Sequence, residues 1–204
     1  MAAVVEAIGG RVDVFGHSYG ALVALEAALR SSGLHRLVLY EPALGARTFP
    51  AETARMERSL ADGRREDVIV TLMRDLAGMT DGQVAVARAL PSWANRVAAA
   101  HTVVRETRAE EGYRFDPARF AGLRVPTLLL RGSESPPWLQ GETDRVASAL
   151  PAARVASLMG HGHVAMLSAP QLVVDLILGF TRGGGIRYRA QLQAPRRASA
   201  VRTS

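Results

Sequence analysis

The chain has 204 residues, which is close to the length of one ordinary domain. Hydrophobic residues make up 48% and charged residues 22%, so the composition excludes disordered and fibrous proteins and supports a sizeable core. The absence of cysteine excludes disulfides, zinc sites with thiolate ligands and a cysteine nucleophile.

The positive charge is concentrated at the C-terminal end of the chain. All 25 basic residues are arginines, set against 19 acidic residues, for a formal net charge of +6. Six arginines and no acid lie in residues 182–204, so residues 1–181 hold 19 of each and are neutral. A neutral body with a basic tail lacks the basic face of a nucleic-acid-binding protein. We therefore expect no nucleic-acid partner.

The apolar segments are short. None reaches the roughly 18 residues that a membrane span needs, and the first ten residues carry Glu6 and no basic leader. We expect no membrane partner and a cytoplasmic location.

The first 40 residues predict alternating helices and strands. Residues 2–9 are typical of a helix that ends at a glycine pair, residues 11–15 (RVDVF) of a buried strand, residues 19–30 of an apolar helix, and residues 37–40 (LVLY) of a second strand. Strands that are continuously apolar indicate a parallel sheet covered on both faces. The pattern predicts an α/β fold.

The rest of the chain predicts a helical insertion and then a return to the sheet. Residues 51–120 form the insertion, with three or four helices and too little separation for an independent domain. The later elements are expected to alternate again between strand and helix: a strand at 125–130, a helix at 142–150, a strand at 153–158 and a helix at 169–180. The α/β domain thus spans residues 1–181. Residues 182–204 are predicted to be a disordered basic tail that adds no stability.

One pentapeptide carries a chemical signature. Gly16-His17-Ser18-Tyr19-Gly20 has the G-x-S-x-G pattern, directly after a buried strand and directly before an apolar helix. In such a sharp turn the positions two before and two after the serine are expected to be very small. Ser18 then stands at the N-terminus of the helix, where backbone N–H groups favour a developing oxyanion.

With these residues in place, the chain resembles the α/β-hydrolase fold family from residue 1 to about residue 181. VDVFGHSYGALVALEAAL is similar to the family's fifth strand, nucleophile turn and following helix, and LVLYEP to its sixth strand. VPTLLLRGSESPP is similar to the seventh strand and acid loop, GHGHVAM to the histidine loop, and residues 51–120 to the helical lid. Four matches in family order are more specific than any one of them.

The resemblance implies a base and an acid for Ser18. His163 holds the position of the base next to the final helix, with His161 ranked second and His17 expected to support the turn. Glu134, in the acid loop, is slightly preferred as the acid over Glu41, which ends the sixth strand. The Tyr19 N–H would form half of the oxyanion hole.

Two functional hypotheses follow. The first is a serine hydrolase without cofactor or metal, acting on a small ester or related carbonyl substrate; the second is a catalytically impaired remnant. The second arises because no room precedes the first predicted strand for the family's first four strands, or for the loop that supplies the other oxyanion N–H. The chain is thus expected to be an N-terminally truncated α/β-hydrolase fold. Its oligomeric state is left open.

Overall fold

The structure is a computed structural model, which describes residues 1–45, 47–183 and 192–193. The chain divides into two compact units, one formed by Met1–Ala43 with Phe115–Ser204 and the other by Leu44–Arg114. The helical insertion therefore forms a unit of its own, and residues 115–120, expected within it, belong to the first unit. Most of the expected tail, residues 184–191 and 194–204, lies outside the described residues.

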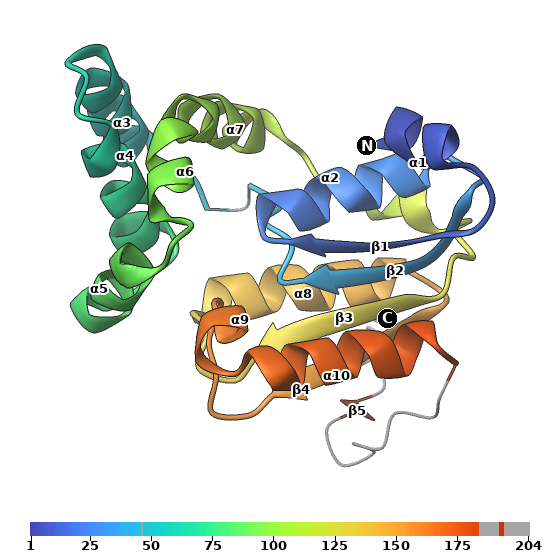
Figure 1. Cartoon of the computed structure of the whole chain (residues 1–204). Coiled ribbons are helices and arrows are strands. Elements are labelled where there is room, and N and C mark those ends of the chain that lie inside the picture. The colour runs from blue at the N-terminus through green and yellow to red at the C-terminus, as the bar shows by residue number, and fades with distance from the viewer. Residues whose placement is uncertain (46, 184–191, 194–204) are drawn as a thin grey trace, which may run out of the picture. The chain divides into compact units, whose positions relative to one another are not determined.

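A mostly parallel sheet forms the centre of the first unit (Figure 1). Its strands are β1 (Val12–His17), β2 (Leu34–Tyr40), β3 (Thr127–Gly132), β4 (Ala153–Leu158) and β5 (Leu192–Gln193), in the spatial order β1-β2-β3-β4-β5. The first four are parallel, and the short β5 pairs antiparallel with β4. The predicted parallel sheet is confirmed.

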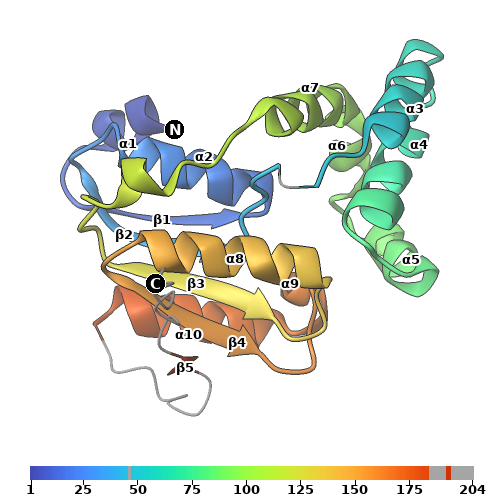
Figure 2. The same cartoon turned by 180° about the vertical axis from the view of Figure 1, so that it is seen from behind.

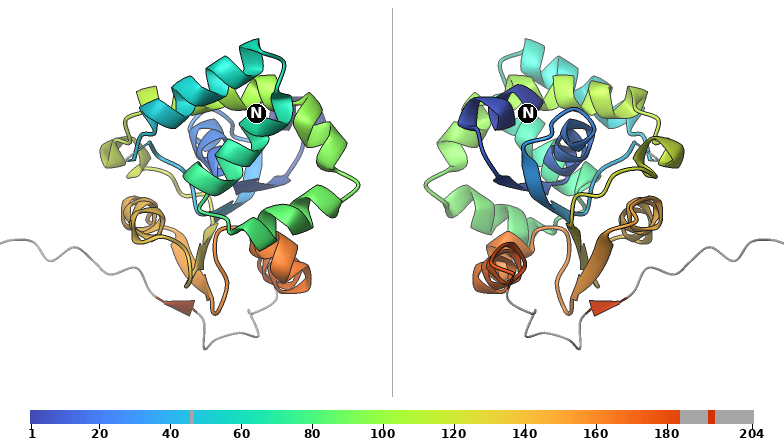
Figure 3. Two further views of the ribbon diagram at one scale, coloured as in Figure 1. Left: turned by 90° about the vertical axis from the view of Figure 1, so that its left-hand side faces the viewer. Right: turned by 90° about the vertical axis from the view of Figure 1, so that its right-hand side faces the viewer.

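Helices cover both faces of this sheet. The helical elements of the first unit are α1 (Ala2–Ile8), α2 (Tyr19–Ala28), the 3-10 helix η2 (Pro117–Phe120), α8 (Pro137–Ala149), α9 (Ala165–Ser168) and α10 (Pro170–Thr181). Figure 1 shows α10 in front of the sheet, and Figure 2, from behind, shows α8. The end-on views of Figure 3 place these two helices on opposite faces.

Alternate residues of β2 point to opposite faces of the sheet. Val38 and Tyr40 of β2 join a buried cluster with Val173 and Leu176 of α10. Leu37 and Leu39, which alternate with them, are also fully buried, whereas His35 and Arg36 near the start of β2 are only partly buried. Burial on both faces explains why residues 37–40 are a continuous apolar run in the sequence.

The second unit is entirely helical where it is described. It contains α3 (Pro50–Ala61), α4 (Arg65–Thr71), a π-helical turn η1 (Leu72–Leu76), α5 (Asp81–Ala89), α6 (Trp93–Ala98) and α7 (Ala100–Gly112). Thr80 and Gln83 form a capping box that fixes the start of α5. These are more helices than the three or four expected. No helix in the described ranges is long and apolar enough to cross a membrane.

Candidate active site

The candidate site lies where the parallel strands of the first unit end. β1 ends at His17, directly before Ser18, and β2 ends at Tyr40, directly before Glu41. Parallel strands bring their carboxyl ends to one edge of the sheet, which is where open α/β sheets bind ligands. His163 lies in the loop between β4 and α9, which reaches the same edge.

Ser18 occupies a strained turn between β1 and α2. Its φ of 54° and ψ of −123° lie in a region that non-glycine residues rarely adopt. A Cβ on Gly16 would lie 2.5 Å from the Gly20 carbonyl oxygen and 2.7 Å from the Ala21 Cα, so the helix passes against the strand and requires glycine there. The expectation for Gly20 was wrong, because a Cβ at that position would meet nothing within 4 Å.

A buried hydrogen bond joins His163 to Glu41. The His163 Nδ1 and Glu41 Oε2 atoms are 2.7 Å apart, and the side chains are 7% and 0% exposed. The Gly132 N–H donates to Glu41 Oε1 at 2.7 Å, and the Ser135 hydroxyl donates to Glu41 Oε2 at 2.9 Å. Since a carboxylate only accepts, Nδ1 carries the proton and Nε2 of the neutral ring is the basic nitrogen.

Glu134 does not take the place that the sequence analysis preferred for it. Its side chain is exposed, and its carboxylate accepts a hydrogen bond from the hydroxyl of Ser133. The structure therefore reverses the order of the two candidate acids. Glu41 reaches the imidazole because its backbone turns into the left-handed region, with a φ of 43°. Among the described residues, Ser18 and Glu41 are the non-glycine residues with positive φ.

His17 and Tyr40 connect Ser18 to the histidine loop. The ring centroids of His17 and His163 are 4.4 Å apart, and His17 Nε2 donates to the His163 carbonyl oxygen at 2.8 Å. The Ser18 N–H donates to the Tyr40 carbonyl oxygen at 2.9 Å. These contacts bring together the histidine loop, Glu41 and the elbow, which is the strand-to-helix turn at Ser18. They also fit the supporting role expected of His17.

Tyr40 and Ser135 contact this site although sequence reasoning gave neither a role. The Tyr40 hydroxyl donates to the Gly162 carbonyl oxygen and accepts from the Ala165 N–H at 3.1 Å. A polar hydroxyl at the buried end of LVLY was the available signal, since a buried tyrosine usually needs a partner. His161, the second-ranked base, faces the Ser168 hydroxyl with its Nδ1 at 3.2 Å instead.

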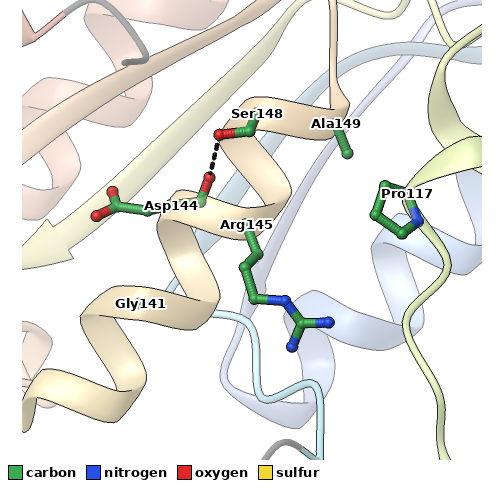
Figure 4. A pocket seen from close by; sticks show the side chains of 6 residues that line it. All are labelled: Pro117, Gly141, Asp144, Arg145, Ser148 and Ala149. Atoms are coloured by element: carbon green, nitrogen blue, oxygen red, sulfur yellow. Dashed lines mark hydrogen bonds between the residues drawn. The ribbon is translucent and has the colours of Figure 1, made fainter. Parts of the chain in front are cut away.

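A surface hollow of the first unit is built from other residues. Pro117 and five residues of α8 line it, and Figure 4 shows the Ser148 hydroxyl bonded back to the Asp144 carbonyl. None of these residues contacts Ser18, His163 or Glu41 through a described hydrogen bond. In the described ranges, no group of three or more histidine or acidic side chains is arranged to hold a metal ion.

The sequence itself matches a family model. Residues 1–176 match the model described as the alpha/beta hydrolase family. The chain belongs to the alpha/beta hydrolase family. This α/β hydrolase has a partial α/β-hydrolase fold, as the resemblance implied, and is a hydrolase enzyme.

Solved structures agree with this assignment. An alpha/beta hydrolase from Sphaerobacter thermophilus DSM 20745 is 30% identical with a TM-score of 0.71, over 87% of this chain and 71% of that chain. The enol-lactonase from Burkholderia xenovorans LB400 is 16% identical with a TM-score of 0.66, over 85% of this chain and 66% of that chain. The carboxylesterase CesB from Bacillus subtilis is 21% identical with a TM-score of 0.62, over 89% and 64%. No match is found among curated proteins.

Proposed function

We propose that this α/β hydrolase cleaves a small ester through Ser18, His163 and Glu41. One observation carries the proposal: a buried imidazole is hydrogen-bonded to a buried carboxylate at 2.7 Å, and its ring packs on His17, the residue before a serine in a strained strand-to-helix turn. A serine hydroxyl is a weak nucleophile until an oriented base takes its proton. This arrangement supplies both the base and its orienting group.

The reaction proceeds in two halves. Ser18 Oγ forms a bond to the ester carbonyl carbon while His163 Nε2 accepts its proton. The C–O bond to the alcohol then breaks, and His163 returns the proton to the departing alcohol oxygen. In the second half, water attacks the acyl-enzyme with the same proton transfers and releases the acid.

Glu41 and the start of α2 stabilise the charges that develop. Glu41 accepts from Nδ1 and so favours the imidazolium that forms when His163 takes the proton. The Tyr19 N–H lies in the first turn of α2, where backbone donors have no partner within the helix, and would donate to the oxyanion. Each charge thus meets a group already held in place.

The ester class is supported by the chemistry of two structural neighbours. A carboxylesterase and an enol-lactonase share this fold, and both reactions are attacks on an ester carbonyl. Neither identifies the acyl or alcohol group for this chain, so we propose the class alone. A p-nitrophenyl ester with a short acyl chain is a suitable probe, because its leaving group departs easily.

Hydrolysis of p-nitrophenyl butyrate tests the proposal. We expect turnover by the unaltered chain, its loss in Ser18→Ala, and a fall of about 10⁴-fold in kcat for Glu41→Gln, which keeps the shape but removes the charge. Glu134→Gln is the matched control, since it changes the same chemical group in an exposed side chain and should leave kcat within a factor of about two.

Three results would contradict the proposal. Equal turnover by Ser18→Ala and the unaltered chain would exclude Ser18 as the nucleophile. A larger loss in Glu134→Gln than in Glu41→Gln would return the acid role to Glu134. An absence of turnover in a folded, unaltered chain would favour the second hypothesis, a protein that keeps the elbow without activity.

A further inference from the structure

Tyr40 lies beneath the loop that carries His163. It is the last residue of β2 and is completely buried. Its hydroxyl donates to the carbonyl oxygen of Gly162 and accepts from the N–H of Ala165 at 3.1 Å. One hydroxyl group therefore holds the backbone on both sides of His163.

The loop is held by backbone as well as side-chain hydrogen bonds: its His161 carbonyl oxygen accepts from the Glu134 N–H at 3.0 Å. It connects the end of β4 at Leu158 to the start of α9 at Ala165 and has no strand or helix of its own. His17 holds the His163 carbonyl oxygen at 2.8 Å, so two side chains from the ends of β1 and β2 support the loop. Of these two, Tyr40 is covalently next to Glu41. The position of Tyr40 at the end of β2 therefore fixes the positions of both the histidine loop and Glu41.

The Tyr40 hydroxyl remains a donor at neutral and mildly alkaline pH. Burial raises the pKa of this phenol well above its ordinary value; the Ala165 N–H opposes that shift, and the nearby Glu41 charge adds to it. The hydroxyl therefore stays protonated at neutral and mildly alkaline pH. Its bond to Gly162 is not lost as pH rises through this range.

We propose that Tyr40 is a positioning residue for His163: its hydroxyl holds residues 162 and 165 so that the imidazole stays on Glu41 and faces Ser18. This inference rests on the proposed function. Tyr40 touches neither the substrate nor the transferred proton, so its effect is on the alignment of the base. Alignment matters because a displacement of about 1 Å can lower turnover roughly 100-fold.

Tyr40→Phe removes the hydroxyl and keeps the ring. We expect kcat for p-nitrophenyl butyrate to fall about 10- to 100-fold, with KM nearly unchanged, because the base is misaligned while the substrate surface is retained. Thr127→Val is the matched control. It removes another completely buried hydroxyl, which donates to the Val125 carbonyl oxygen at 2.9 Å on β3, away from the loop.

The control separates positioning from stability. Tyr40→Phe loses two buried hydrogen bonds and Thr127→Val loses one, so the thermal midpoint should fall in both variants, whereas only Tyr40→Phe should lose kcat. Equal kcat in the two folded variants would overturn the proposal. Loss of kcat in both would also overturn it, because the effect would then come from general destabilisation.

A measurement on the unaltered chain tests the proposal if the Tyr40→Phe variant does not fold. The Ala165 amide should exchange with solvent deuterium slowly, since its N–H donates to a buried hydroxyl. Exchange as fast as in an exposed loop would overturn the contact and the proposal with it. If the unaltered chain does not hydrolyse the ester, the proposed function fails, and the amide exchange still tests the Tyr40 contact separately.

Discussion

Glu41 and Glu134 differ in backbone conformation, and this difference decides which of the two carboxylates reaches His163. Both follow the carboxyl end of a strand, and β2 and β3 are neighbours, so the sequence places both acids at one edge of the sheet. Glu41 turns inward through a φ of 43°, while Glu134 remains exposed. A left-handed conformation at a non-glycine residue has no signature in an apolar pattern, and so the preference for Glu134 could not be tested on the sequence.

A substitution at Ser135 can place a second carboxylate beside the imidazole of His163 and so test the role of Glu41. Its hydroxyl and His163 Nδ1 bind the same Glu41 oxygen, at 2.9 and 2.7 Å, so an aspartate at 135 would bring a carboxylate close to the imidazole. Ser135→Asp alone should lower kcat, because two adjacent carboxylates disfavour each other's charge. In the Glu41→Ala background the same change should raise kcat about tenfold or more, because it restores a partner for His163.

A double-mutant cycle on p-nitrophenyl butyrate hydrolysis measures this reversal. Ser133→Asp in the Glu41→Ala background is the control, since it adds the same charge to the same loop at a residue that does not contact Glu41. We expect no recovery there. If Ser135→Asp lowers kcat equally in both backgrounds, Glu41 is not the group that orients His163.

At the scale of elements, the apolar runs predicted strands and helices well where both faces are buried. The strand at 153–158 has the predicted bounds, and the final helix differs from its prediction by one residue at each end. The four-residue α9 was missed because it is shorter than two turns and shows no period. The second unit has more helices than expected, since similar helix-favouring residues continue across its breaks.

Gly132, the last residue of β3, binds Glu41 and packs closely against the neighbouring loops. The Gly132 N–H donates to Glu41 Oε1, and a Cβ there would lie 2.6 Å from both the His161 carbonyl oxygen and the Ser135 hydroxyl oxygen. We expect Gly132→Ala to lower the free energy of unfolding by about 1–3 kcal/mol, since the loops must move apart. It should also lower kcat, because those loops carry the partners of Glu41.

Gly141→Ala provides the comparison. This glycine lies within α8 and a Cβ would meet nothing within 4 Å, so alanine should raise the free energy of unfolding by about 0.5–1 kcal/mol. Urea denaturation measures both changes. A Gly132→Ala variant as stable and active as the parent would show that the β3 end does not pack as described.

At the scale of the whole molecule, the order of the motifs carried more information than any one motif. The elbow, the sixth-strand acid, the acid loop and the histidine loop follow one another along the chain, and that order predicted the family. The contacts that assemble the site, unlike the motifs, join residues that are far apart in the sequence. The Tyr40 hydroxyl meets residue 162 across 122 positions of sequence, and a pairing at that separation follows from the register of the sheet rather than from any local pattern.

The account's central claim is that Ser18 is the activated nucleophile of this α/β hydrolase. Treatment of the unaltered chain with a fluorophosphonate probe, followed by peptide mass spectrometry, tests it without knowledge of the substrate. We predict that Ser18 is the one serine modified, because among the described serines it alone has a positive φ, and His17 next to it packs its ring on that of His163. Modification of another serine, with Ser18 untouched, would contradict the claim.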